Sequence, residues 1–293
     1  MSSDFDFDYT AVGHVTVDVL ADGSRRAGGT AFYSALQAAR LGRRTLIRTR
    51  GRAREIEALV EPYRGEIELE IEPARATTTL DTRGWDATRT QRMLAWAGPM
   101  AAQSGLDSAI VHLAPVAREC PAAWSGRSAF VGLTPQGLAR TWAGLEAAGA
   151  DGACAGGEIS LLAPGEAAER LARRCDAIVV NEHERASCEA LIRGARAAGA
   201  VTAVTAGAAP TAILLADGSA LELQVPAIEG PLEDLGAGDV FAAAFFVGLA
   251  DGLAPARAAA FANAAAAVRV LGAGAHAIGD AAAIAARLGA VAG

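Results

Sequence analysis

The feature that most constrains this chain is a turn of small residues that leads into a long apolar segment. Gly236-Ala237-Gly238 precedes Asp239, and the apolar run Val240 to Leu249 follows. A helix that begins at such a turn leaves its first N–H groups unpaired, at the positive end of the helix dipole. The two glycines let the backbone approach a ligand closely. The stretch therefore predicts an anion site, most often for phosphate, with Asp239 as a candidate general base. The alternative is an ordinary loop with an Asp helix cap.

Strand-like and helix-like segments alternate along most of the 293 residues. Strands are expected at 9–20, 45–48, 109–113, 128–132, 176–180 and 201–205, and helices near 30–41, 54–63, 166–174, 238–250, 255–271 and 280–288. The Asp217-Gly218 turn predicts a hairpin between 213–215 and 220–223. This alternation predicts an α/β fold with a mainly parallel sheet and helices on both faces.

Residues 66–98 have a different pattern. Ile67 to Ile71 alternate between apolar and acidic residues, and a threonine-rich stretch begins at Thr77. Such segments are typical of half-exposed antiparallel strands. We therefore expect a single domain over residues 1–293, with a small β lid or edge sheet at the half-exposed strands and lid segments roughly at 14–27 and 66–98.

Composition excludes several classes of function. The chain has no lysine, so all 26 basic residues are arginine, and neither a Walker P-loop nor Schiff-base chemistry is available. The net charge of -7 argues against nucleic-acid and acidic-membrane partners. No apolar run is long enough for a membrane span, and the acidic N-terminus lacks a signal core, which predicts a cytoplasmic protein. The spacing of the four cysteines and four histidines indicates neither a disulfide framework nor a zinc site.

The order of the polar and glycine elements resembles the ribokinase-like (PfkB) family of sugar kinases. These elements are Asp18, Gly28-Gly29, Asn181-x-x-Glu184, Thr205-x-Gly207 and the Gly-Ala-Gly-Asp turn. The resemblance covers essentially the whole chain. It implies a ribokinase-like α/β fold with a mainly parallel central sheet, helices on both faces and a small β lid.

The same resemblance implies roles for individual residues. Asp239 would be the catalytic base, and Gly236, Ala237 and Gly238 would form the anion hole for the transferred phosphoryl group. The acceptor-binding residues would be Asp18, Gly28 and Gly29. The cofactors would be ATP and Mg²⁺, and the residues that bind them would be Asn181, Glu184, Thr205, Gly207 and Asn263, with Glu184 at the metal. The alternatives are a helix N-cap for Asn181 and an ordinary helix-face residue for Asn263.

Some positions depart from the family pattern. Glu233 and Asp234 stand where Asp or Asn followed by Thr or Pro is usual, and two carboxylates beside a triphosphate repel it unless a cation or arginine offsets them. Ala208-Ala209-Pro210 stands in place of the second glycine of the nucleotide loop, and Phe32-Tyr33-Ser34 stands in place of the Asn common after Gly-Gly.

Two segments are similar to a branch that contains archaeal-type sugar kinases and myo-inositol kinases. They are Gly132 to Arg140 and Thr77 to Leu80. In this branch Gln136 and Arg140 could contact the acceptor or a phosphate; the alternative is a turn with a solvated arginine.

The resulting prediction is an ATP-dependent kinase that phosphorylates a hydroxyl of a small sugar or cyclitol. A nucleoside kinase is one alternative, with aromatic walls drawn from Phe32, Tyr33, Trp85 and Trp96. A non-catalytic relative that binds a sugar or nucleotide is the other, favoured by Glu233 and Asp234. An exposed lid edge would also favour a homodimer formed through the lid.

Overall fold

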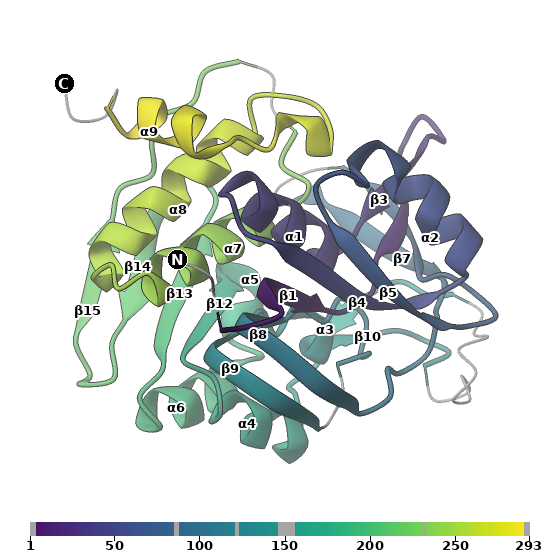
Figure 1. The fold of residues 1–293 in the computed structure, drawn as a ribbon, viewed down its shortest axis with the longest axis horizontal. Coiled ribbons are helices and arrows are strands. Elements are labelled where there is room, and N and C mark those ends of the chain that lie inside the picture. The colour runs from purple at the N-terminus through teal and green to yellow at the C-terminus, as the bar shows by residue number, and fades with distance from the viewer. Residues whose placement is uncertain (1–3, 85–87, 121–122, 146–155, 231–232, 290–293) are drawn as a thin grey trace.

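The computed structural model describes residues 4–84, 88–120, 123–145, 156–230 and 233–289. In this part of the chain a nine-stranded sheet has the order β15-β14-β13-β12-β9-β8-β1-β4-β5 (Figure 1). Its strands are β1 (Phe7–Val12), β4 (Thr45–Gly51), β5 (Glu68–Pro73), β8 (Gln103–Leu113), β9 (Trp124–Leu133), β12 (Ala177–Asn181), β13 (Val201–Ala206), β14 (Ala209–Leu214) and β15 (Ala220–Leu223). Neighbours pair in parallel from β5 to β13, whereas β13, β14 and β15 pair antiparallel, so the expected mainly parallel sheet is confirmed.

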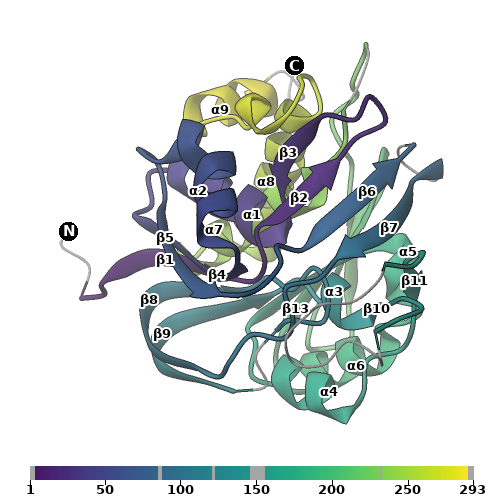
Figure 2. The same cartoon turned by 90° about the vertical axis from the view of Figure 1, so that its right-hand side faces the viewer.

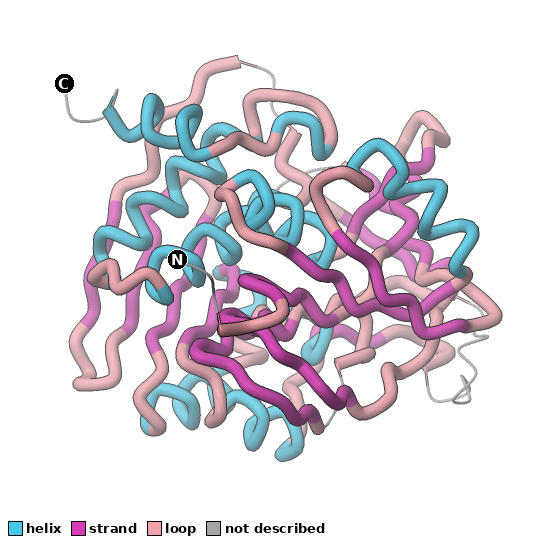
Figure 3. Tube along the Cα trace, viewed as in Figure 1, coloured by secondary structure: helices cyan, strands magenta, loops and turns pink. Residues whose placement is uncertain are grey.

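Helices cover both faces of this sheet (Figures 1 and 3). One face carries α1 (Thr30–Arg40), α2 (Ala53–Val60), α7 (Ala237–Ala250), α8 (Pro255–Arg269) and α9 (Ala281–Gly289). The other carries α4 (Glu166–Ala172) and α6 (Glu189–Ala197). Helix α7 is buried from Val240 to Gly248 because its surface is apolar on all sides. This burial between α1 and α8 fixes the position at which α7 begins.

A second, four-stranded sheet stands apart from the main sheet (Figure 2). Its order is β3-β2-β6-β7, from β2 (Thr16–Val19), β3 (Arg25–Gly28), β6 (Thr79–Arg83) and β7 (Thr90–Ala95). We call it the lid sheet. Two short helices, α3 (Gln136–Ala139) and α5 (Glu182–Arg185), and the small pair β10 (Arg140–Thr141) and β11 (Ser160–Leu161) lie near it.

The expectation of one strand over residues 9–20 is wrong. The chain leaves the main sheet at Gly13, where a Cβ would lie 2.1 Å from the carbonyl oxygen of Ala114. Beyond this point the His14 N–H donates to Glu119 and the Val15 N–H donates to Thr49, so side chains replace the sheet ladder. The segment resumes as β2 of the lid sheet. Asp18 therefore lies on the lid sheet and not at the end of a main-sheet strand.

Residues 67–71 also differ from the expectation of antiparallel lid strands. They lie largely in β5, which pairs in parallel with β4 at the edge of the main sheet. Leu69 and Ile71 pack on the main core, whereas Glu68 and Glu70 are exposed, which explains the alternation. The hairpin predicted around Asp217-Gly218 is confirmed as β14 and β15.

No helix in the described ranges is long and apolar enough to cross a membrane. Trp85 and Cys154 lie outside the described residues.

Candidate active site

The turn before α7 is held in a conformation that requires glycine. Gly236 has φ +82° and ψ 0°, in the left-handed region. A Cβ at this position would lie 2.4 Å from Cδ1 of Tyr33, so the Tyr33 ring packs directly against the turn. Helix α7 then begins at Ala237, which places Asp239 in its first turn.

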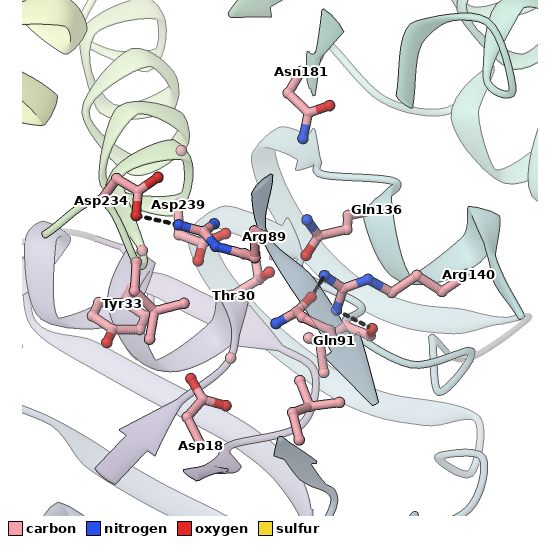
Figure 4. A pocket seen from close by; sticks show the side chains of 16 residues that line it. Asp18, Thr30, Tyr33, Arg89, Gln91, Gln136, Arg140, Asn181, Asp234 and Asp239 are labelled. Carbon is pink, nitrogen blue, oxygen red and sulfur yellow. Dashed lines mark hydrogen bonds and ion pairs between the residues drawn. The ribbon is translucent and has the colours of Figure 1, made fainter. Parts of the chain in front are cut away.

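A cavity of about 120 Å³ lies at this turn, between the lid sheet and the start of α7. Figure 4 shows Asp18 from β2 and Asp239 from α7 directed toward it from different elements. Of the residues predicted from the sequence, those that line it are Asp18, Gly29, Gln136, Arg140, Asn181, Gly236, Gly238 and Asp239. We call it the acceptor cavity.

Gly28 and Gly29 shape the part of this cavity around Asp18. A Cβ on Gly28 would lie 2.0 Å from Oδ2 of Asp18, and a Cβ on Gly29, which has φ +90°, would lie 2.4 Å from the His14 carbonyl oxygen. Asp18 is buried and accepts a hydrogen bond of 2.9 Å from the Thr16 hydroxyl. Burial raises the pKa of Asp18 to about 6, although the positive charges of Arg140 and Arg89 act in the opposite direction.

Asp239 has the electrostatic properties of a general base that works near neutral pH. Burial raises the pKa of Asp239 to about 7, and the charges of Glu184 and Asp18 contribute in the same direction. Arg140 opposes them. A base is most effective when its pKa lies near the working pH. Asp239 therefore combines a suitable pKa with a place inside the cavity.

Gln91, Gln136 and Arg140 lie across the cavity from Asp239, and Arg89 lies beside it (Figure 4). Arg140 is buried and donates to the Val116 carbonyl oxygen at 2.9 Å and to Oε1 of Gln91 at 2.6 Å. Arg89 forms an ion pair with Asp234. The cavity thus holds fixed hydrogen-bonding groups of both signs, which suits a small polyhydroxylated ligand.

A second cavity of about 200 Å³ lies on the other side of the α7 N-terminus. The predicted residues that line it are Asn181, Thr205, Gly207, Ala237, Gly238 and Asn263. It shares Arg89, Asn181, Asp234 and Gly238 with the acceptor cavity. The helix N-terminus therefore lies where the two cavities meet. We call the second one the donor cavity.

The side-chain amide of Asn263 is already hydrogen-bonded within the protein. It is buried, its Oδ1 accepts a hydrogen bond of 2.9 Å from Thr211, and its Nδ2 donates to the Gln224 carbonyl oxygen at 3.3 Å. These bonds join α8 to β14 and to the end of β15 at the wall of the donor cavity.

Asn181 and Glu184 form a reciprocal capping box at the start of α5. Asn181 Oδ1 accepts from the Glu184 N–H at 2.9 Å, and Glu184 Oε2 accepts from the Asn181 N–H at 3.3 Å. Gln136 Nε2 donates to Glu184 Oε1 at 2.8 Å. Each carboxylate oxygen thus keeps a further lone pair. Glu184 could hold Mg²⁺, directly or through water, when donor phosphates supply the other ligands.

Arginines offset the two carboxylates that depart from the family pattern. Glu233 accepts from Arg26 at 3.0 Å, from Arg269 at 3.0 Å and from the Gly274 N–H at 2.9 Å. Burial opposes ionisation of Glu233, but these contacts lower its pKa overall. Asp234 in turn pairs with Arg89. The negative charge of each carboxylate is therefore offset by an arginine and would not repel a phosphate in the site.

Sequence reasoning did not assign Thr30, Arg89, Gln91 and Asp234 to the acceptor site, although all four line that cavity. One signal was present, because Arg89 and Gln91 are two residues apart in an extended segment and so share a face. Of the aromatic residues proposed as walls, Tyr33 lines the acceptor cavity. Trp96 instead packs on Trp142, at 5.5 Å between ring centroids.

Residues 155–280 match the model of the pfkB family of carbohydrate kinases. A search of curated proteins gave no match. Among solved structures, the chain resembles a pyrophosphate-dependent kinase in the ribokinase family complexed with a pyrophosphate analogue and myo-inositol, with TM-score 0.69 and 21% identity over 91% of this chain and 96% of that chain.

Two further structures have the same fold. Arabidopsis thaliana ribokinase complexed with ribose and ATP matches with TM-score 0.68 and 17% identity over 96% of this chain and 98% of that one. Methanocaldococcus jannaschii nucleoside kinase matches with TM-score 0.69 and 15% identity over 98% of this chain and 100% of that one. Residues 155–280 therefore resemble the pfkB family of carbohydrate kinases, and the chain has the ribokinase-like fold of these solved structures.

Proposed function

We propose that this protein transfers a phosphoryl group from a donor in the donor cavity to a hydroxyl of a sugar or cyclitol in the acceptor cavity. The observation that carries the proposal is the position of Asp239. Its half-buried carboxylate lies in the first turn of α7, in the acceptor cavity and close to the edge shared with the donor cavity. A hydroxyl held there could lose its proton to Asp239 as it attacks the donor phosphorus.

The lining of the acceptor cavity favours a polyol over a nucleoside. Asp18 is placed to accept hydrogen bonds from ligand hydroxyls, and Gln136 and Arg140 offer donors from the opposite wall. Tyr33 is an aromatic lining residue, but its ring is already packed against Gly236. Stacking of a nucleobase would need a free aromatic face.

The N-terminus of α7 would stabilise negative charge on the transferred group. The Ala237 N–H donates to the Asp234 carbonyl oxygen at 3.1 Å, which closes the turn. The N–H groups of Gly238 and Asp239 follow in the helix and would therefore supply most of the anion hole. Preorganised donors of this kind are commonly worth about 3 kcal/mol each in the transition state.

Two donors are consistent with the donor cavity. ATP would extend along Thr205 and Gly207 toward Asn263, as the family resemblance implies. Pyrophosphate would need only the part near Asn181 and Gly238; the relative bound to a pyrophosphate analogue shares the fold. With either donor, Mg²⁺ near Glu184 would neutralise phosphate charge when bound.

The proposal is tested by a screen of sugars, cyclitols and nucleosides with ATP or pyrophosphate and Mg²⁺. ADP release and phosphate release report turnover. The screen is repeated with Asp239→Asn and with Asp251→Asn as its matched control. Asp251 is a suitable control because it caps the opposite end of α7 and is exposed in an ion pair with Arg43. The proposal is supported if wild type phosphorylates a sugar or cyclitol and the Asp251→Asn variant keeps this activity. Ligand binding without turnover on any acceptor with either donor would overturn it in favour of a non-catalytic binding protein.

A homodimer through the lid sheet also remains a proposal. The outer edge of β7 is covered by the chain itself, since the Met93 N–H donates to Gly157 and the Ile159 N–H donates to Gln91. Pairing would therefore have to use β3. Light scattering coupled to size-exclusion chromatography, with Arg25→Pro to block that edge, would test it.

A further inference from the structure

Arg269 is a fully buried cation that the proposed chemistry does not use. It is the last residue of α8, and its side chain is 0% exposed. Burying a charged group is costly unless hydrogen bonds and opposite charge compensate it. The contacts of this guanidinium therefore indicate what it stabilises.

Four oxygen atoms surround the guanidinium group. Nη2 donates to the Leu235 carbonyl oxygen at 2.6 Å and to Oε1 of Glu233 at 3.0 Å. Nη1 donates to the carbonyl oxygens of Gly272 at 3.0 Å and Glu233 at 3.3 Å. Carbonyl and carboxylate oxygens around one positive charge form the kind of site that a hard metal cation occupies. We call these four oxygens the oxygen cage; in this chain a side chain fills it.

The oxygen cage belongs to the loop that leads into the anion hole. Because a trans peptide places C=O and N–H on opposite sides, a Leu235 carbonyl directed at Arg269 turns the Gly236 N–H away from it. Gly236 lines the acceptor cavity and packs on Tyr33. The Arg269 guanidinium lies 5.6 Å from the centroid of the same Tyr33 ring. Arg269 thus holds both the backbone of the turn and the ring on which the turn rests.

We propose that Arg269 is the positioning residue of the anion hole and acts as a built-in cation, so that the reaction needs no monovalent metal ion. This inference rests on the proposed function. Arg269 touches no reacting atom. It fixes the peptide orientations of Glu233 to Gly236 and places a permanent positive charge beneath the site where phosphate charge develops.

The test combines Arg269→Ala with chemical rescue and a matched control. Arg40 is the control because it makes the same kind of contacts: its guanidinium binds the carbonyl oxygens of Ala275, His276 and Ile278, and it pairs with Glu66. It does not contact the turn before α7. Arg40→Ala should lower Tm yet leave kcat within about twofold of wild type, since the hydrogen bonds and ion pair that it removes lie away from the turn before α7.

For Arg269→Ala we expect kcat to fall roughly 100-fold or more while both KM values change less than about fivefold, the pattern of a lost transition-state interaction. Guanidinium or K⁺ at millimolar levels should then raise kcat at least about tenfold, because either can enter the emptied oxygen cage. Wild-type kcat should stay within about twofold when tetramethylammonium replaces all alkali cations.

Three results would overturn the proposal: an unchanged kcat in folded Arg269→Ala, a loss that no cation rescues, or strong alkali-cation dependence of the wild type. The wild-type measurement decides the question even if the variant fails to fold. If wild type turns over no acceptor, the proposed function fails separately. In that case the role of Arg269 is tested by measuring the affinity of both proteins for inorganic pyrophosphate by calorimetry. Arg269→Ala should weaken this affinity roughly tenfold, and guanidinium should restore it. Equal affinity in both proteins would overturn it.

Discussion

Arg89 and Asp234 form an ion pair across the junction of the acceptor and donor cavities, although 145 residues separate them in the sequence. Arg89 lies in the segment that leads into β7 of the lid sheet, and Asp234 lies in the loop before α7 (Figure 4). The pair thus joins the lid sheet to the loop that builds the anion hole. It also places a guanidinium where the transferred phosphoryl group would pass.

Arg89→Gln should reduce kcat/KM roughly 10- to 100-fold, because both lid closure and charge neutralisation suffer. Asp234→Asn should cost less, since it leaves Arg89 free to contact the donor. Steady-state kinetics of both variants and of the double variant form a double-mutant cycle. A coupling energy of about 0.5 to 3 kcal/mol is expected for contacting residues, and strict additivity would show that the pair does not act as a unit.

The pH dependence of turnover should report Asp239. With its pKa raised by burial to about 7, the carboxylate is mostly protonated below that pH and cannot accept a proton. The value of kcat/KM should therefore rise tenfold per pH unit below about 7 and level off above it. A pH–rate series in buffers of constant ionic strength measures this. A profile that is flat from pH 5 to 8 would contradict the assignment.

Asp239→Asn should stabilise the fold at alkaline pH. The folded pKa of about 7 exceeds the ordinary value of 3.8, so the folded state holds the proton more tightly than the unfolded state. The stability from this protonated carboxyl is fully present below pH 3.8 and is lost as pH rises through about 7. At pH 8 the asparagine variant should unfold with a free energy higher by on the order of 1 to 4 kcal/mol, measured by urea denaturation. The gain should disappear near pH 4, and a gain of equal size at both values would exclude this cause.

Gly236 and Gly238 provide a matched pair of substitutions. Gly236→Ala forces a Cβ against Tyr33 at a positive φ, so it should lower the unfolding free energy by roughly 1 to 3 kcal/mol. A Cβ on Gly238 meets no atom within 4 Å, and this residue lines both cavities. Gly238→Ala should therefore keep its Tm and raise the donor KM. Thermal melts and kinetics separate the two, and equal Tm losses would contradict the model of the turn.

Local patterns predicted much of this molecule. The turn at Gly236, the apolar α7 and the Asp217-Gly218 hairpin are encoded by adjacent residues, so the sequence was enough to place them. The order of motifs predicted that Asp18, Asn181 and Asp239 belong to one site, and in the structure all three line the acceptor cavity.

What sequence could not supply depends on contacts between distant segments. The apolar run at 9–20 gives no sign of the break at Gly13, which arises because Ala114 lies against it. The sequence could not show whether an arginine offsets Glu233 and Asp234, because their partners, Arg269 and Arg89, come from other elements. Alternation at 67–71 could not show whether β5 joins the lid sheet or the edge of the main sheet, since either position exposes one face.

The role of Asp239 as general base is tested most directly by ³¹P NMR of product formation by wild type and Asp239→Asn, side by side, with the donor and acceptor found in the screen. If Asp239 is the general base, wild type should yield a phosphorylated acceptor, and Asp239→Asn should form it at a rate at least roughly 1,000-fold lower, with donor and acceptor affinities retained. Product formation by Asp239→Asn at a rate close to wild type would contradict the role of Asp239 and the mechanism built on it.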